Sequence, residues 1–176
     1  MDNNLTSDYK IILIDSSNVF YNNGNNNFDF HINFLDPLRD VYKIKILYDA
    51  VSFNTNKLIS NTSNLDIIYV NLNGLDRIRT SIIDPITKDI NELYYFDSIM
   101  IDKNKIKINQ DVNDTTMFND FNENEGDYYL KPIASQFNRI NIELRNKNND
   151  LITKDYIDRF VMKICIYYNI KKISQF

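Results

Sequence analysis

The single histidine of the chain, His31, lies two residues from Asp29, and a histidine beside a carboxylate is half of a catalytic triad. Both belong to residues 28–34, where every second residue is apolar, so successive side chains point to opposite faces of a predicted strand. Asp29 and His31 then share the outward face. Nucleophilic catalysis also needs an activated Ser or Cys beside the base, and the sequence has no G-x-S-x-G segment. We therefore predict a structural role for His31, no catalytic residue and no enzyme activity.

The single cysteine, Cys165, is the other candidate nucleophile. It falls on the outward face of the last predicted strand, between Lys163 and Tyr167, and a nearby lysine can lower the pKa of a thiol. One Cys and one His cannot supply the ligands of an ordinary zinc site. A lone cysteine also excludes an internal disulfide, as suits a reducing compartment. We predict that Cys165 packs rather than reacts, and that three glycines without a phosphate-binding motif indicate no cofactor.

An acidic segment, residues 110–127, offers the hard oxygen ligands that calcium prefers. Its carboxylates belong to Asp111, Asp114, Asp120, Glu123, Glu125 and Asp127. The order D-x-N-x-N-x-G from Asp120 resembles the start of an EF-hand loop, but its glycine is one place late. Lys131 also stands where the bidentate glutamate belongs. We predict a long solvated acidic loop, with a calcium site as the alternative.

The composition indicates one globular domain that positions these residues. The chain has 176 residues, 43% of them hydrophobic, which is enough to build a core without a disulfide or a metal. The net charge of −4 gives no electrostatic footprint for nucleic acid, and no apolar run approaches the ~20 residues that span a bilayer. We predict a flexible N-terminal arm over residues 1–9 and a single domain over 10–176.

The elements of that domain are predicted to be strands, because alternation of apolar and polar residues recurs while no helical stripe does. A short strand, 10–14, ends at the turn-forming D-S-S-N of residues 15–18. Pro37 is expected to break the strand that begins at residue 28. Further strands are predicted at 41–53, 65–73, 93–101, 137–144 and 158–168, with 78–90 and 103–108 ambiguous and a hairpin-type turn at 145–150. The fold class is therefore all-β, a single antiparallel β-sandwich of the jelly-roll type.

The last strand, 158–168, carries apolar residues on both faces. Its predicted inner face holds Phe160, Met162, Ile164, Ile166 and Tyr168. The outer face holds Val161, Cys165 and Tyr167, where a solvated sheet would place charge. Twelve tyrosines and no tryptophan also suit protein–protein contact, because tyrosine offers a large area with a polar tip. Either loops of the same chain or a partner covers that face. With Tyr21 of the Asn-rich loop 21–27, these three residues are the interface candidates.

Three segments together resemble minor capsid proteins of nucleo-cytoplasmic large DNA viruses. They are K-I-I-L-I-D-S-S (10–17), F-D-F-H-I-N-F-L-D-P-L-R-D-V-Y-K-I-K-I-L-Y-D-A-V (28–51) and Y-Y-L-K-P-I-A-S-Q-F-N-R-I-N-I-E-L-R-N-K-N-N-D-L-I (128–152). In that family an I-x-I-D-S opening commonly continues with an arginine, whereas Ser17 follows here. The closing hairpin often holds glycine where Asn148 and Asn149 stand. Residues 54–127 carry none of the resemblance.

The resemblance implies a structural virion protein located in the capsid and made in the host cytoplasm. Its partners would be the major capsid protein and other minor capsid proteins, with no nucleic acid and no membrane span. It would cement contacts between capsomers. Two alternatives stay open: a penton protein at the fivefold vertices, which would be a homopentamer, and a calcium-dependent ligand- or carbohydrate-binding β-sandwich module.

Overall fold

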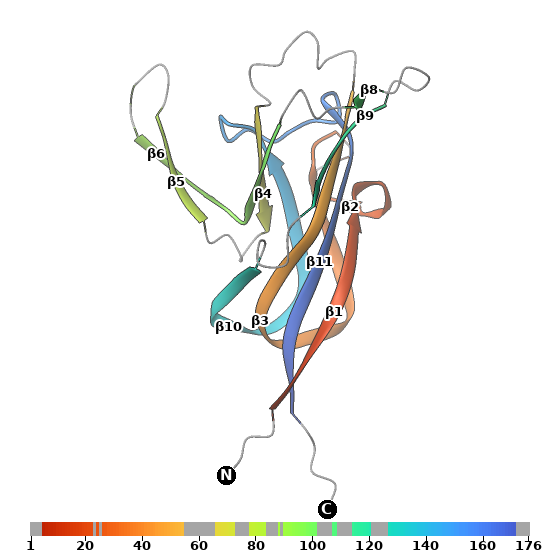
Figure 1. Ribbon diagram of the computed structural model, residues 1–176, viewed down its shortest axis with the longest axis vertical. Coiled ribbons are helices and arrows are strands. Elements are labelled where there is room, and N and C mark those ends of the chain that lie inside the picture. The colour runs from red at the N-terminus through yellow and green to blue at the C-terminus, as the bar shows by residue number, and fades with distance from the viewer. Residues whose placement is uncertain are drawn as a thin grey trace, which may run out of the picture.

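The computed structural model describes residues 5–22, 24, 26–54, 66–72, 78–83, 88, 90–101, 107–108, 114–120 and 127–171. Within those residues the chain consists of strands and one 3-10 turn, η1 (Ser16–Asn18), with no α-helix (Figure 1). The strands are β1 (Leu5–Asp15), β2 (Phe20–Tyr21), β3 (Asp29–Asn54), β4 (Ile67–Leu72), β5 (Ile78–Ile83), β6 (Ile90–Tyr95), β7 (Asp97–Met100), β8 (Lys107–Ile108), β9 (Asp114–Asp120), β10 (Asp127–Arg145) and β11 (Ile157–Lys171). The described residues contain no helix that is long and apolar enough to cross a membrane.

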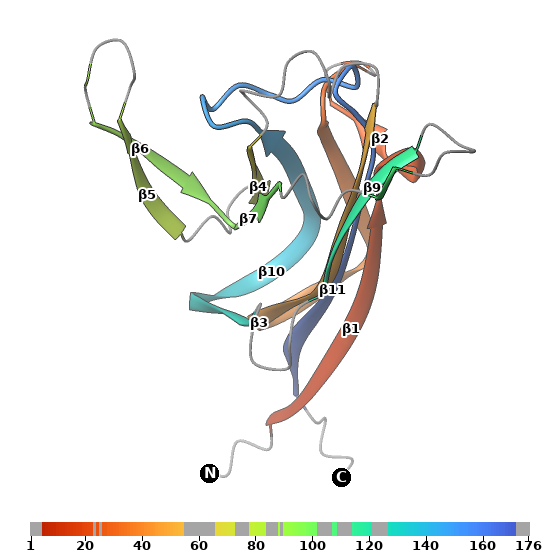
Figure 2. The same cartoon turned by 45° about the horizontal axis from the view of Figure 1, so that its top comes forward.

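Nine of these strands form one antiparallel sheet whose main path is β1-β11-β3-β10-β4-β7. Strands β2 and β9 pair with β3, and β8 pairs with β9, while β5 and β6 form a separate hairpin. Figure 2 shows that the large sheet curls, so β10 and β4 stand across the interior from β11 and β1. The sheet is therefore a half-barrel whose concave side holds the core.

The long strand β3 makes most of this curvature. Its first part pairs with β10, and its second part lies between β11 on one edge and β10 or β9 on the other. Between Asn33 and Leu38 the register with β10 shifts, and Asp40 adopts a positive φ of 52°. Pro37 lies inside this irregular stretch, where no ladder hydrogen bond is required of its nitrogen. The expectation that Pro37 ends the strand is therefore wrong; the strand bends there and continues.

The core residues follow the alternation read from the sequence. Phe28 and Phe30 are fully buried, and Ile32 and Phe34 pack against the same cluster. The inner face of β11 is likewise fully buried at Phe160, Met162, Ile164 and Ile166, with Tyr168 packed against the core. Burial of each such side chain stabilises the fold by about 1.5–3 kcal/mol relative to exposure. The predicted inner faces of both strands are confirmed.

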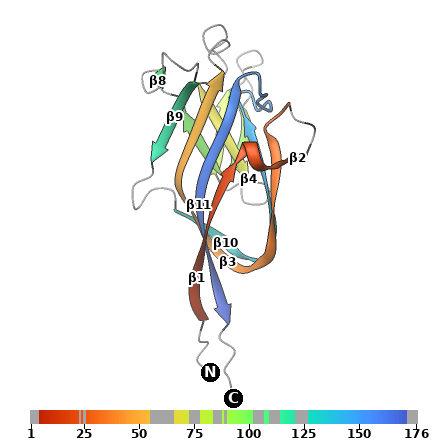
Figure 3. The ribbon, with the colours of Figure 1, turned by 90° about the vertical axis from the view of Figure 1, so that its right-hand side faces the viewer.

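The N-terminal strand begins earlier than the sequence indicates. Residues 5–9, predicted as a flexible arm, pair antiparallel with residues 167–171 of β11. Residues 1–4 lie outside the described residues. Figure 3 shows β1 and β11 running together toward the two ends of the chain. Pairing with β11 orders these residues although their own sequence is polar.

The acidic segment also contains a strand where a loop was predicted. Residues 114–120 form β9, which pairs with residues 48–54 of β3. The run T-T-M-F at 115–118 has the β-prone residues that a sheet edge accepts, and β3 supplies the partner. The prediction of one long acidic loop is wrong for this stretch.

The hairpin-type turn predicted at 145–150 agrees with the structure. Asn149 has a φ of 68°, the left-handed conformation for which asparagine was expected to replace glycine. The Asn146 side chain accepts backbone hydrogen bonds from Asn148 and Asp150 at 2.9 Å, closing the turn between β10 and β11. The ambiguous stretch 78–90 resolves into β5 and the start of β6, while its D-P pair at 84–85 lies outside the described residues.

The predicted all-β antiparallel class is thus confirmed. The jelly-roll-like sandwich, with two sheets facing each other, stays a prediction, because the described strands of the main body belong to one curled sheet.

Candidate protein-interaction surface

The outward face of β1 carries an apolar stripe in contact with solvent. Tyr9, Ile11 and Leu13 are 59%, 51% and 58% exposed. The alternate residues point the other way: Ile14 is fully buried and Ile12 packs against the core. We call Tyr9, Ile11 and Leu13 the outer stripe. An apolar row on an ordered strand costs solvation free energy while it stays exposed, so it is a candidate contact surface.

An aromatic–lysine cluster adjoins this stripe on β11, β3 and β10. The Tyr9 and Tyr167 rings are 6.0 Å apart, and Tyr42 lies 6.3 Å from Tyr167. The Lys43 ammonium lies 4.0 Å from the Tyr167 ring centroid and 5.7 Å from that of Tyr129. These aromatic rings offer broad, rigid contact area. We call Tyr42, Lys43, Tyr129 and Tyr167 the aromatic–lysine cluster.

Charge and hydrogen bonding hold this cluster in place. The Lys43 ammonium lies 3.4 Å from the Asp127 carboxylate. The Tyr42 hydroxyl shares a 2.6 Å hydrogen bond with the Ser7 hydroxyl of β1. The contact with the Cys165 thiol, and to a smaller extent burial, raises the pKa of Tyr167 to about 12. Lys43 was expected to lie on a solvated face, but it is half-buried among aromatic rings.

The four interface candidates named from the sequence lie in three places. Cys165 and Tyr167 face outward beside the outer stripe, where Cys165 pairs in register with Ile11 and is buried as a free thiol. Val161 is half-buried near the other end of β11. Tyr21 lies at the far side of η1. Its hydroxyl donates to the Ser16 carbonyl at 2.7 Å, and the Lys154 ammonium lies 4.0 Å from its ring.

The D-S pair of the opening segment, Asp15 and Ser16, has a structural role. Asp15 receives a bidentate pair of hydrogen bonds from the Arg159 guanidinium on β11. The Ser16 hydroxyl accepts from the Phe160 backbone N–H at 2.9 Å, and Ser17 donates to Asp15. The Arg159 hydrogen bonds, aided by those from Ser17, hold the pKa of Asp15 well below 3.8. These contacts lock the end of β1 to β11, and we call Asp15, Ser16 and Arg159 the β1–β11 lock.

The His31–Asp29 pair does not form a catalytic arrangement. His31 Nδ1 lies 2.6 Å from the Asn22 side-chain oxygen, and the imidazole stacks on Phe20 with ring centroids 6.0 Å apart. Asp29 was expected to face solvent, yet it is buried, and the Asn22 amide donates to its carboxylate at 2.6 Å. Both side chains fasten the 20–22 segment to β3.

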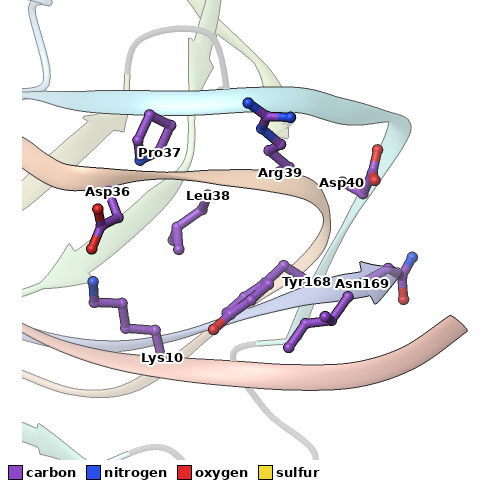
Figure 4. A pocket seen from close by; sticks show the side chains of 9 residues that line it. Lys10, Asp36, Pro37, Leu38, Arg39, Asp40, Tyr168 and Asn169 are labelled. Carbon is purple, nitrogen blue, oxygen red and sulfur yellow. The ribbon is translucent and has the colours of Figure 1, made fainter. Parts of the chain in front are cut away.

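A cavity of about 640 Å³ opens between the bend of β3 and the inner faces of β1 and β11 (Figure 4). Its lining combines cations from Lys10 and Arg39 with anions from Asp36 and Asp40. The remaining lining residues are Pro37, Leu38, Tyr168, Asn169 and Ile170. Two charges of each sign give the cavity no preference for an anion or a cation.

Two buried carboxylates, those of Asp97 and Asp49, lie inside the half-barrel, and we call them the buried acidic pair. Asp97 on β7 is 7% exposed, and its carboxylate accepts a 3.1 Å hydrogen bond from the Tyr128 hydroxyl on β10. Burial raises the pKa of Asp97 above 3.8, and burial together with the charge of Asp97 raises the pKa of Tyr128. Asp49 lies nearby on β3 and is fully buried. These groups belong to the core and not to an open site.

The described carboxylates proposed as calcium ligands do not lie together. Asp114 and Asp120 stand at opposite ends of β9, so their backbones are about 20 Å apart at the rise of a strand. Asp127 is paired with Lys43. Asp111, Glu123 and Glu125 lie outside the described residues. Within the part of the chain that is described, no group of three His, Cys, Asp or Glu side chains could hold a metal ion.

The outer stripe was not predicted from the sequence. Tyr9 was assigned to the N-terminal arm, and residues 10–14 to a strand whose two faces were not distinguished. The signal was present in Y-K-I-I-L-I, where the residues of both parities are largely apolar. A strand with apolar residues on both faces has one face in the core and a second that needs another explanation.

No protein-family model matches the chain, and no curated protein matches its sequence. The resemblance to minor capsid proteins therefore stays a prediction.

Proposed function

We propose that this chain is a structural protein of a virus shell, a minor capsid or cement protein without enzyme activity. Its outer stripe and aromatic–lysine cluster would bind the major capsid protein and so stabilise contacts between capsomers. The observation that carries the proposal is the outer stripe, three exposed apolar side chains on an ordered strand that is fastened to β11. Covering each of them would contribute roughly 1 kcal/mol to association.

The placement of the segments that resemble minor capsid proteins supports this proposal. They fall on β1, β3 and β10, and with β11 these strands are consecutive neighbours in the sheet. Segments far apart in the sequence thus build one continuous surface unit. The D-S pair of the opening segment also belongs to the β1–β11 lock, which fixes the strand that carries the outer stripe.

Mass spectrometry with cross-linking of purified virions tests the proposal. We expect the chain to be present in the particle and to cross-link through β1 or the aromatic–lysine cluster to the major capsid protein. Absence from the particle would contradict it.

A matched pair of variants tests the surface itself. Ile11→Ser with Leu13→Ser removes two apolar side chains from the outer stripe, and we expect the variant to fold but to be lost from particles. Met100→Ser is the control, because Met100 is 68% exposed on β7 at the opposite end of the sheet path. Equal loss of both variants would contradict a role for the stripe.

The oligomeric state of the purified protein distinguishes a penton protein from a cement protein. A penton would form a homopentamer, whereas the cement protein would not. Sedimentation velocity distinguishes the two.

A further inference from the structure

Strand β1 ends the main path of the sheet, and its second edge is open among the described strands. One edge pairs with β11 over all of its eleven residues, and no described strand pairs with the other. The Tyr9 N–H donates to the Asp8 carboxylate at 2.8 Å rather than to β11. Because N–H and C=O of one residue point to the same side of an antiparallel strand and alternate along it, Ser7, Tyr9, Ile11 and Leu13 present these groups to the open edge.

A long open edge of this kind is a template for another strand. We propose that β1 pairs antiparallel with β1 of a second copy of this chain, about a two-fold axis at Tyr9. An isologous dimer results, in which each contact occurs twice. The occupant is the chain itself because the charges of β1 complement one another in this register.

Only the odd-numbered residues of β1 present N–H and C=O groups to the open edge. Two copies can therefore pair only in registers that place odd-numbered residues of one copy opposite odd-numbered residues of the other. With the axis at Tyr9, Asp8 of each copy faces Lys10 of the other, which makes two ion pairs. With the axis at Lys10 or at Asp8, two like charges face each other directly, which is unfavourable. With the axis at Ile11, Lys10 faces Ile12 and Asp8 faces Ile14, so neither charge finds a partner. The register at Tyr9 is therefore the complementary one.

The contacts of Asp8 and Lys10 in the single chain allow this exchange. Asp8 accepts the Tyr9 N–H and, at 3.4 Å, the Tyr168 hydroxyl. The Lys10 ammonium lies 5.8 Å from the Phe34 ring centroid. Pairing gives the Tyr9 N–H a carbonyl acceptor on the partner's Tyr9. The Asp8 carboxylate is then available to the partner's Lys10.

The two-fold axis stands perpendicular to the sheet, so both outer stripes lie on the same side of the dimer. Tyr9 of each copy meets Tyr9 of the other at the centre, and Ser7 faces Ile11. The dimer carries one apolar surface twice as long as that of a single chain. The purified chain alone would form this dimer, whether or not the protein has a capsid function.

A charge exchange tests the register. The probes are Asp8→Lys and Lys10→Asp, each measured alone and in an equimolar mixture by sedimentation equilibrium. We expect the wild type to dimerise. Each single variant should have a dimer dissociation constant at least about tenfold higher, because both ion pairs become repulsions. The mixture should restore association as a heterodimer, since every Lys then faces an Asp. Failure of the mixture to associate better than its components would overturn the register.

A backbone substitution tests the edge. Ile11→Pro removes an N–H that faces the open edge without removing a bond to β11, and we expect it to abolish the dimer. Ile11→Thr keeps the N–H and serves as the control that should still dimerise. Circular dichroism and the melting temperature report whether each variant folds. A monomeric wild type, a pentamer, or a dimer that survives Ile11→Pro in a folded variant would overturn the proposal, whatever the chain does in particles.

Discussion

The start of β3 and the strand β1 both place apolar side chains in the core, but their outward faces differ in polarity. In β3, Phe30 and Ile32 point to the core while His31 and Asn33 face outward. In β1, Ile12 and Ile14 point to the core, but the outer stripe on the other face is apolar as well. Packing of the core explains Phe30, Ile32 and Phe34 at the start of β3, but only two of the five apolar residues at 9–14 of β1, Ile12 and Ile14. The other three form the outer stripe, as a binding surface would require.

The largest expected effect is on the free energy of unfolding, and it should differ between the two faces of β1. Ile14→Ala should lower the free energy of unfolding by about 2–5 kcal/mol, because it leaves a cavity in the core. Leu13→Ala, one residue away on the exposed face, should change it by no more than about 0.5 kcal/mol. Urea unfolding followed by circular dichroism measures both. Similar losses for the two variants would mean that the outer stripe serves folding after all.

The next effect concerns the β1–β11 lock that presents the stripe. Arg159→Gln removes the cation from the mostly buried Asp15 carboxylate and should cost about 1–3 kcal/mol near neutral pH. The folded pKa of Asp15 is lowered, so its contribution is present above the unfolded value of 3.8 and is lost as the pH falls below it. The difference between wild type and variant should therefore shrink in acid. A difference independent of pH would contradict the ion pair as its cause.

A smaller effect of opposite sign is expected at the buried acidic pair. The folded pKa of Asp97 is raised by burial, so the folded protein holds that proton more tightly than the unfolded chain. Stability then falls as the pH rises from 3.8 through the raised value. Asp97→Asn keeps an acceptor for the Tyr128 hydroxyl and carries no charge, so we expect a slightly higher melting temperature at neutral pH. A lower one would show that the Asp97 carboxylate is stabilising.

The smallest effect is expected from calcium. Asp114 and Asp120 stand at the two ends of β9, and Asp127 pairs with Lys43, so these three cannot close around one ion. We predict that neither added calcium nor EDTA changes the melting temperature. A clear rise with calcium would revive the alternative of a calcium-dependent binding module.

Strands and their inner faces could be predicted from the sequence because a period of two is a local signal. It located Phe30 and the inner face of β11, and the N-N pair located the left-handed turn at Asn149. Features that depend on a distant partner were missed. The order of residues 5–9 comes from β11, the strand β9 forms on β3, and the bend at Pro37 follows from pairing with β10. The Asp29 carboxylate likewise has a partner that the sequence did not indicate, the Asn22 amide directly after β2.

The candidate surface could be predicted only in part, for the same reason. Cys165 and Tyr167 were expected on an apolar outer face, and they lie there. The stripe beside them required knowing that β1 is the neighbour of β11 in the sheet. Lys43 was placed on the correct face, but the tyrosine rings against its ammonium, Tyr129 and Tyr167, come from two other strands, β10 and β11.

Site-specific photo-cross-linking in assembled particles tests the role of the outer stripe most directly. A photo-reactive residue at Leu13 reports what lies against that face, and one at Asn138, which is exposed on β10, is the control. We predict cross-links from position 13 to the major capsid protein and none from position 138. Position 13 cross-linking to no other shell protein, in particles that contain the chain, would contradict the account.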